Sequence, residues 1–226
     1  MKIISDIRVF HSSWENIDGN ALPCYIENKE LICVIHRIVM KLREKHFSLG
    51  EFDHLYINFT TCHVKNGVAP AKRSVDRYHP WFRYIDVEVG TELFESFQEK
   101  RCIQPVVDII KQVLTKFFCS PEFDAEAIRT YFSDAIEQGE NMLMKFKEKT
   151  SSGITAIVYL RFLDCGLYEP LLRVHDTDNH LLLEKKLKRT IVLDAYGEIR
   201  VSKKQVSIIP RRNSFTKGLE PMVFAY

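Results

Sequence analysis

The sequence predicts an α+β protein, with a mixed α/β part over residues 1–150 and an antiparallel, strand-rich part over residues 151–226, packed as one unit or as two closely joined lobes. Two observations predict this class. Before residue 150, alternating apolar segments are interleaved with segments of helical spacing, whereas after it come short β-branched or aromatic segments between turn residues. The chain has 226 residues, 46% of them hydrophobic, which is enough to build its own core.

The first elements expected are a strand and a helix. Residues 2–10 suit a short strand, and an Asp-Gly-Asn turn at 18–20 follows it. Residues 30–46 predict an amphipathic helix, because their apolar side chains recur at the i, i+3, i+4 and i+7 positions. Gly50 ends the connection that leads to the next strand.

Two alternating stretches predict neighbouring strands. In HLYINFT, residues 54–60, every second side chain is apolar, and the others form a second face that includes Tyr56 and Asn58. Residues 81–90, WFRYIDVEVG, repeat the division and place Tyr84 on the second face. We expect these strands to pair, directly or through one neighbour.

A loop and two helical regions complete the first part. Residues 62–80 lack a clear period and predict a long loop, which in a compact domain is usually functional or disordered. Helical spacing covers residues 91–118, with Pro105 near a helix start, and returns over residues 122–147, the longest helix expected. That helix carries an acidic set of side chains: Glu122, Asp124, Glu126, Asp134, Glu137 and Glu140.

The last part predicts an antiparallel meander of six short strands. Their expected ranges are 154–164, 169–176, 180–189, 190–195, 197–202 and 205–210. This part is locally basic, since Glu184 to Lys217 contains ten basic and three acidic residues.

Charge, hydropathy and cysteine spacing exclude several classes of protein. With 32 basic and 30 acidic residues, the formal net charge of +2 makes no case for a whole-molecule nucleic-acid binder or a membrane-surface protein. Neither a signal peptide nor a run of 18 apolar residues is found, so we expect a cytoplasmic protein without a membrane segment. The six cysteines are scattered, which predicts reduced thiols rather than a disulfide framework or a zinc site.

Candidate catalytic and metal-binding residues are few. Cys62 and His63 resemble a nucleophile and its base, but neighbours on a strand point to opposite faces, so this pair fails unless the strand has already ended. His54 and Asp86 form a better acid–base candidate if the strands pair in the right register, although a structural histidine is the commoner meaning.

A crowded turn and the absence of motifs argue against a cofactor. The turn carries His175, Asp176, Asp178 and His180, yet its spacing matches neither a calcium loop nor a helical zinc pair, so a solvated hairpin turn is preferred. The chain has no Gly-rich phosphate loop, G-x-S-x-G or H-E-x-x-H motif. We expect no metal and no cofactor.

The basic C-terminal strands leave nucleic-acid binding open as an alternative. Segments such as KKLKR and RVSKK could track phosphates, and Phe215 could stack on a base. Exposed strands also carry lysine to discourage edge pairing, and aromatic residues are sparse here. We therefore expect only weak, non-specific retention of nucleic acid.

The remaining polar and aromatic side chains favour recognition of a protein, because Tyr, Trp and Arg are common interface anchors. Residues 50–120 contain the stretch LYINFTT, then a loop, then WFRYIDVEVG, and then paired helices. In this order they resemble small cytoplasmic immunity proteins that accompany bacterial polymorphic toxins. The resemblance implies a non-enzymatic protein that binds and blocks a cognate toxin. The candidate partner-binding residues are Asp134, Glu137, Glu140, Tyr56, Asn58, Arg73, Arg77, Tyr78, Trp81 and Tyr84.

Overall fold

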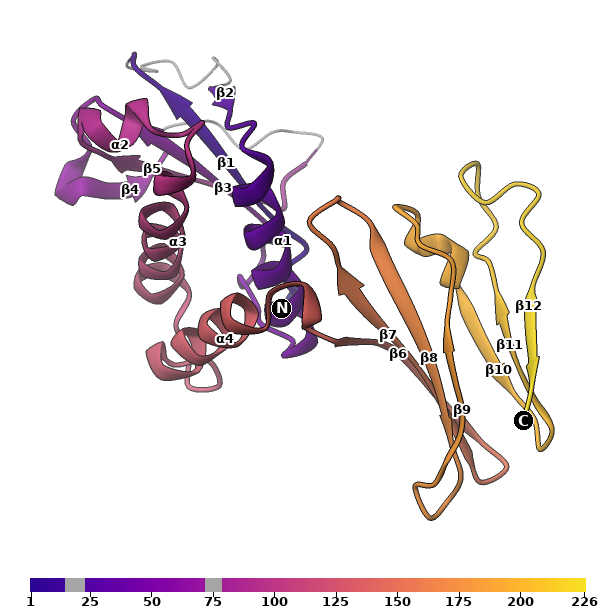
Figure 1. Cartoon of the computed structure of the whole chain (residues 1–226). Coiled ribbons are helices and arrows are strands. Elements are labelled where there is room, and N and C mark those ends of the chain that lie inside the picture. Colours follow the sequence, from indigo (N-terminus) through magenta and orange to yellow (C-terminus); the bar gives the residue numbers. More distant parts are fainter. Residues whose placement is uncertain (15–22, 72–78) are drawn as a thin grey trace. The chain divides into compact units, whose positions relative to one another are not determined.

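The chain folds into two compact units (Figure 1), and the computed structural model describes residues 1–14, 23–71 and 79–226. Unit 1 is Met1–Gly139 and unit 2 is Glu140–Tyr226. The fold is α+β, as the sequence predicts. The division expected at residue 150 falls inside unit 2, near the end of its first strand, β6 (Met144–Ser151).

Unit 1 contains a five-stranded sheet with a parallel centre. Its strands are β1 (Asp6–Ser12), β2 (Cys24–Tyr25), β3 (His54–Thr60), β4 (Val68–Pro70) and β5 (Phe82–Glu88). Their order is β2-β1-β3-β5-β4, in which β1, β3 and β5 run parallel and the two short edge strands run antiparallel to their neighbours. The two alternating stretches of the sequence therefore pair directly. The register aligns Arg8, Tyr56 and Tyr84 across the three central strands.

Helices connect and cover this sheet. They are α1 (Lys29–Glu44), α2 (Thr91–Glu95), α3 (Ile103–Phe118) and α4 (Ala125–Gln138), with 3-10 turns η1 (Lys65–Gly67), η2 (Lys100–Cys102) and η3 (Gly139–Asn141). α1 supplies the crossover that parallel strands β1 and β3 require, and it packs against β1, α3 and α4. The continuous helix expected over 91–118 is divided between α2 and α3.

The bounds predicted for the longest helix, 122–147, are wrong at both ends, because α4 begins at Ala125 and ends well before residue 147. α4 ends at Gln138, and Gly139 adopts φ 50° and ψ −130°, a conformation suited to glycine that stops the helix. Residues Met144–Ser151 form the strand β6 instead. Glu140 consequently lies outside the helix, in η3.

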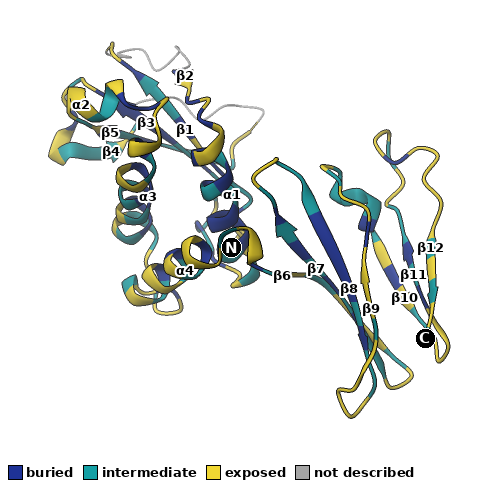
Figure 2. Ribbon diagram, in the orientation of Figure 1, coloured by how far each residue is buried: buried dark blue, intermediate teal, exposed yellow. Residues whose placement is uncertain are grey.

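The two faces of the central sheet differ in burial. Leu55, Ile57 and Phe59 of β3 have no exposed surface, and Ile85 of β5 is equally enclosed, as the alternation of the sequence predicts. The core of unit 1 therefore lies between this face and the helices, and Figure 2 shows the buried stripe along α1. On the other face Tyr56 and its neighbours are half-buried, whereas Asn58 is buried at 6% exposure.

Unit 2 is built from two antiparallel sheets. The first has the order β6-β7-β8-β9, with β6 (Met144–Ser151), β7 (Ile154–Phe162), β8 (Tyr168–His175) and β9 (Leu181–Lys186). The second has the order β10-β11-β12, with β10 (Glu198–Val201), β11 (Gln205–Ile209) and β12 (Met222–Ala225). Both sheets contribute to one core that includes Val158, Leu172, Val206 and Ile208.

Five of the six C-terminal strands expected are present, as β7, β8, β9, β10 and β11. The strand expected at 190–195 is wrong, because Thr190 makes only an isolated bridge to Tyr168 and the 3-10 turn η4 (Leu193–Tyr196) follows. The sequence analysis also missed β6 and β12. β9 is an edge strand that carries Lys185 and Lys186, in keeping with lysine protection of exposed edges.

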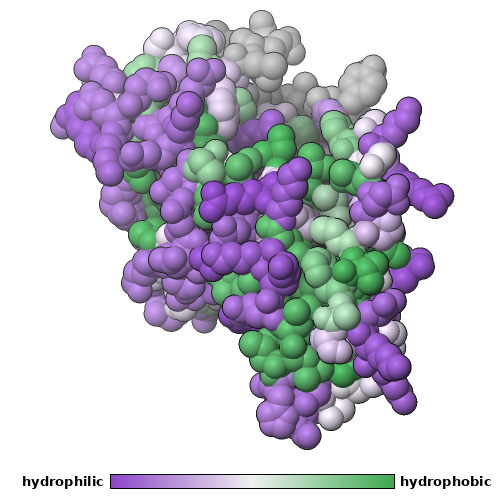
Figure 3. Space-filling view, turned by 45° about the vertical axis from the view of Figure 1, so that its right-hand side comes forward, coloured by the Kyte–Doolittle hydropathy of each residue, from purple (hydrophilic) through white to green (hydrophobic). Residues whose placement is uncertain are grey.

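The surface mixes hydrophobic and hydrophilic residues, as Figure 3 shows for one face of the molecule. Leu181 and Leu182 of β9 are 52% and 41% exposed. Exposed apolar side chains are usual for folded proteins. No helix in the described part of the chain is long and apolar enough to cross a membrane.

Candidate recognition surface at the edge of the sheet

The face of the unit 1 sheet opposite the helix-covered one carries a group of touching aromatic rings, which we call the aromatic face. It consists of Phe10, Tyr25, Tyr56, Phe82 and Tyr84. Tyr56 is at its centre, with ring centroids 5.5 Å from Phe10, 4.9 Å from Phe82 and 5.3 Å from Tyr84. Tilted and edge-on arrangements are the favourable geometries for pairs of aromatic rings. The face is therefore a pre-organised surface of aromatic side chains.

The parallel register explains why these residues gather. Side chains of aligned residues in adjacent strands share a face, so Arg8, Tyr56 and Tyr84 form one row. The Arg8 guanidinium lies 5.6 Å from the Tyr56 ring centroid, and its Nε donates to Asp6 Oδ2 at 2.7 Å. The cation is thus placed over an aromatic ring while its charge is balanced by a neighbouring carboxylate.

The carboxyl ends of the three parallel strands carry a polar cluster. Asn58 Nδ2 donates to Ser12 Oγ at 3.1 Å and to Asp86 Oδ1 at 2.9 Å. Asn58 Oδ1 is buried and has no hydrogen-bond partner among the described residues. The amide orientation is nevertheless fixed, because a carboxylate needs the donor side of the amide. Asn58 therefore holds β1, β3 and β5 together at this end of the sheet.

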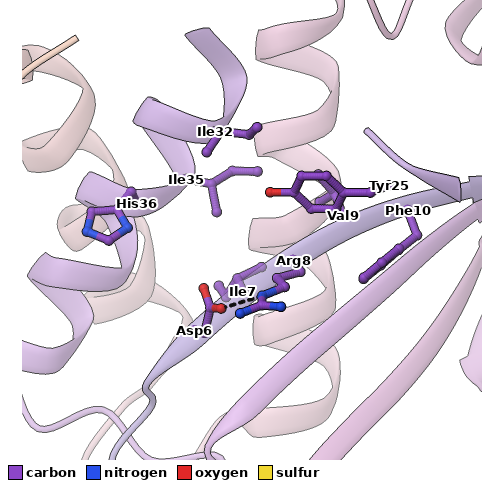
Figure 4. Close-up of a pocket in the computed structure, with 9 residues that line it drawn as sticks. All are labelled: Asp6, Ile7, Arg8, Val9, Phe10, Tyr25, Ile32, Ile35 and His36. Atoms are coloured by element: carbon purple, nitrogen blue, oxygen red, sulfur yellow. Dashed lines mark hydrogen bonds and ion pairs between the residues drawn. The ribbon is translucent and has the colours of Figure 1, made fainter. Parts of the chain in front are cut away.

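A pocket of about 520 Å³ opens beside β1 (Figure 4). Its lining combines residues of β1, β2 and α1: Asp6, Ile7, Arg8, Val9, Phe10, Tyr25, Ile32, Ile35 and His36. In Figure 4, Tyr25 reaches from β2 toward the α1 isoleucines, and the Asp6–Arg8 pair lies below it. The pocket thus has apolar walls and a polar side, a composition typical of sites that take up an organic group or side chain.

The backbone edge of β1 is open next to this pocket. β2 pairs only with Phe10 and His11, and Val9 O accepts from Ile26 N at 3.1 Å. Backbone groups of alternate residues point to the same edge, so those of Ile7 face outward as well. In the described part of the chain no strand pairs with Asp6–Arg8 on that side. This edge can accept a further strand.

Burial shifts the pKa values of titratable groups around the pocket. It lowers the pKa of His36 to about 4, with help from Arg43 and Arg37 and against the opposing effect of Asp6. His36 is therefore neutral at pH 7. Burial also raises the pKa of Tyr25 and of Tyr56, so both phenols stay protonated. At neutral pH the Asp6–Arg8 pair is the main charged feature of the pocket.

The structure does not bring together His54 and Asp86, the alternative acid–base candidate. The register aligns His54 with Phe82 and Asp86 with Asn58, which separates the two by four positions along the strands. His54 Nδ1 instead lies 2.6 Å from Asp53 Oδ1. The condition set for this candidate, a register that brings the two side chains together, is therefore not met, because alternation assigns a face but does not fix the position of one strand against another.

The other candidate reactive groups also have different partners. β3 ends at Thr60, so Cys62 and His63 are not on a strand, but His63 Nδ1 is 3.1 Å from Glu88 Oε2. Among the described residues Asp176, Asp178 and His180 can bring ligand atoms within 4.8 Å of one another. However, Asp176 Oδ1 already accepts from the backbone of Asp178 and of His180, as in an ordinary hydrogen-bonded turn.

The acidic residues predicted to bind a partner each have a partner within the fold. Asp134 Oδ2 lies 3.1 Å from Lys41 Nζ, which joins α4 to α1. Glu137 accepts from Ser133 Oγ at 2.7 Å, and Glu140 accepts from the backbone of Asp164 in unit 2. Part of the acidic charge of α4 is therefore used within the fold.

The remaining predicted residues divide between the aromatic face and its surroundings. Tyr56 and Tyr84 belong to the aromatic face, and Asn58 lies buried at its polar end. Trp81 comes just before β5, with Lys2 Nζ 4.8 Å from its ring centroid. Arg73, Arg77 and Tyr78 lie outside the described residues.

Sequence analysis missed the contributions of β1, β2 and α1 to the pocket. Alternation of Asp6, Arg8 and Phe10 with Ile7 and Val9 in β1 was an available signal. β2 has only two residues and gives no period, so the place of Tyr25 could not be found in this way. No family model, curated protein or solved structure matches the chain.

Proposed function

We propose that this protein is a non-enzymatic binding protein that takes up an extended segment of a protein partner along the open edge of β1. The observation that carries the proposal is the edge of β1 that no other described strand pairs with at Asp6–Arg8, beside a pocket with apolar walls. Addition of a partner strand to a sheet edge gives affinity through backbone hydrogen bonds, and side-chain pockets give specificity. A side chain of the bound segment would enter the pocket.

The composition of the surface supports a protein partner. Aromatic and arginine side chains are enriched at sites that dominate binding energy, and Tyr25, Phe10 and Arg8 surround this edge. Tyr25 is 40% exposed, so it has surface to lose on binding. Natural proteins usually protect open edges, for instance with lysine or proline. The described edge residues of β1 include neither lysine nor proline, although Asp6 and Arg8 are charged.

Charge favours a protein over a nucleic acid at this surface. Arg8 is paired with Asp6, and Lys2 Nζ is 3.9 Å from Asp53 Oδ2. The described part of the face therefore has no uncompensated positive charge, whereas a phosphate backbone requires several. The arrangement of His54 and Asp86 likewise gives no support to the enzyme alternative.

A narrower proposal identifies the partner as a bacterial toxin that the protein blocks. It rests on the resemblance of residues 50–120 to immunity proteins. Binding through a pre-formed edge and pocket is compatible with inhibition, because an immunity protein must hold its toxin without chemical reaction. Identification of the partner decides between this role and another protein-binding role.

The test begins with affinity capture of the partner from the native host and its identification by mass spectrometry. Binding of the purified partner is then measured with Tyr25→Ala, and with Phe215→Ala in unit 2 as a control exposed aromatic residue. We expect Tyr25→Ala to weaken binding by about tenfold or more, since truncation of an interface anchor commonly costs over 1 kcal/mol. Phe215→Ala should bind as wild type does.

Hydrogen exchange locates the site independently of any substitution. Strand addition should slow exchange of the Ile7 amide, which faces the open edge, when the partner is bound. Protection confined to α4, together with loss of binding in Glu137→Lys, would instead assign the site to the acidic helix. Recovery of no protein partner, or full-strength binding by a correctly folded Tyr25→Ala variant, would remove support for the proposal.

A further inference from the structure

Unit 2 contains a second pocket, of about 560 Å³, that is separate in sequence and composition from the one in unit 1. Its lining comes from β6, η4, β10, the end of β11 and the segment that follows it, and it contains four basic and two acidic side chains: Lys147, Asp194, Gly197, Glu198, Arg200, Ile209, Pro210, Arg211 and Arg212. The sequence analysis noted the basic tail as a possible strand surface but did not place these residues together. The fold brings Lys147 close to Arg200, Arg211 and Arg212, which lie more than fifty residues later in the sequence.

The pocket wall depends on a close approach at Gly197. A Cβ at this position would lie 2.4 Å from Arg211 N and 2.8 Å from Ile209 O, both backbone atoms. Glycine therefore lets the chain after β11 pass directly beside the start of β10. Arg211 N donates to Asp194 O at 2.8 Å, which fixes that approach.

The turn after Arg211 is also held by hydrogen bonds. Asn213 Nδ2 donates to Asp194 Oδ2 at 2.6 Å, and Asn213 Oδ1 accepts from Phe215 N at 2.9 Å. Thr216 is 5% exposed, and its hydroxyl donates to the carbonyl of Arg211. The backbone that carries Arg211 and Arg212 is consequently ordered from both sides.

A β-bulge in β6 directs Lys147 toward the same pocket. The register with β7 shifts between Lys145 and Lys147, and such bulges re-aim side chains. Lys147 Nζ donates to the carbonyl of Gly197. Since an ammonium group has three donors, two remain for a ligand. Burial lowers the pKa of Lys147, the charge of Arg211 adds to this effect, and Asp194 opposes it.

The charges of the pocket do not balance. Arg200 Nε is 3.0 Å from Glu198 Oε1, and Arg211 Nη1 is 3.8 Å from Asp194 Oδ1. In the described structure neither Lys147 nor Arg212 has an ion-pair partner. Lys147 and Arg212 therefore give the pocket an excess of two positive charges, beside the two arginines that are paired. An excess of this size matches the charge of a dianion.

We propose that this pocket binds the phosphate group of a small phosphomonoester. Arginine offers fork-shaped pairs of donors to phosphate oxygens, and lysine adds a compact point charge. A phosphomonoester carries close to two negative charges at neutral pH, which matches the excess in the pocket. Each phosphodiester of a nucleic acid carries one charge, and strand binding needs a row of cations rather than one compact group. The volume also suits a small ligand.

The test uses the full chain and titrates it with inorganic phosphate and with ribose 5-phosphate, followed by amide NMR shifts and calorimetry. Shifts should concentrate at Lys147, Gly197, Arg211 and Arg212. Arg212→Ala should weaken binding of both probes by about tenfold, because one charge-assisted contact is lost. Arg212 is exposed, so this variant should keep the wild-type fold. Lys147→Met provides a second variant at the inner wall.

Lys203→Ala is the matched control, since it removes the same charge from the turn between β10 and β11, outside the pocket lining. It should bind both probes as wild type does. Equal weakening by Arg212→Ala and Lys203→Ala would show diffuse attraction and overturn the proposal, as would the absence of shifts at millimolar phosphate. Tighter binding of a single-stranded oligonucleotide than of ribose 5-phosphate would assign the surface to nucleic acid instead.

Discussion

His36 shows how a single residue of the pocket in unit 1 connects burial with stability. Its pKa of about 4 in the folded chain lies below the ordinary value of 6.5, because burial disfavours the imidazolium and Arg43 and Arg37 repel it. Between these two pH values the unfolded chain takes up a proton at this site and the folded chain does not. The contribution of His36 to stability is therefore present above pH 6.5 and is lost as the pH falls toward 4.

We predict that His36→Gln weakens this pH dependence. When the pH is lowered from 7 to 4, the free energy of unfolding should decrease more in wild type than in the variant, by up to roughly 3 kcal/mol. Urea unfolding followed by tryptophan fluorescence measures it, because both tryptophans, Trp14 and Trp81, lie in unit 1. The carboxylates common to both proteins contribute equally and cancel in the difference. Parallel stability curves over this range would contradict the role assigned to His36.

Individual residues also show what alternation can and cannot predict. The period of two correctly placed Tyr56 and Tyr84 on one face, because side-chain direction is a local property of a strand. It did not predict that Asn58 is buried or that His54 and Asp86 are separated. Those facts depend on register and on what packs over the strand, which are set by distant parts of the chain.

At the scale of elements, the boundary between α4 and β6 shows why short apolar runs mislead. Met142, Leu143 and Phe146 continue the helical spacing of the preceding residues, but the same residues also suit a strand. Gly139 and the pairing of β6 with β7 decide the outcome. The strong, long period of α1, in contrast, was sufficient to predict that helix from the sequence.

Two helix caps allow a prediction about how elements are joined. Asn28 Oδ1 accepts from Leu31 N at the start of α1, and its Nδ2 donates to Phe97 O at 3.0 Å and Glu99 O at 3.2 Å. Asp124 only caps α4, through Ala127 N at 2.8 Å, and is exposed. Asn28 thus caps a helix and ties it to a distant segment.

We predict that Asn28→Ala lowers the free energy of unfolding of unit 1 by about 2–4 kcal/mol, because it removes the cap of α1 together with the two hydrogen bonds from Asn28 Nδ2 to Phe97 O and Glu99 O. Asp124→Ala should cost about 1 kcal/mol, the usual value for an exposed cap. Urea unfolding followed by tryptophan fluorescence compares the two variants. Similar losses would mean that the link from Asn28 to Phe97 and Glu99 adds no stability.

At the scale of the whole molecule, the chain contains two self-sufficient sets of secondary structure. The sheet of unit 1 is completed by strands from Met1–Gly139, and both sheets of unit 2 are completed within Glu140–Tyr226. Unit 2 has its own buried core, to which both of its sheets contribute. The sequence predicted the change in character between the two parts, but the true start of the second was hidden because β6 resembles the end of a helix.

We predict that residues 140–226 fold alone, whereas residues 151–226 do not fold stably. The longer fragment keeps β6, which pairs with β7 along its length and brings Lys147 to Gly197. The shorter fragment begins where the sequence pattern changes, and it leaves β7 as an open edge with its apolar side chains partly uncovered. Amide NMR spectra and thermal unfolding compare them: the longer fragment should give dispersed signals that match those of unit 2 in the full chain and should melt cooperatively. Dispersed, cooperative behaviour of both fragments would show that β6 is dispensable, and collapse of the longer one would show that unit 2 depends on unit 1 for its fold.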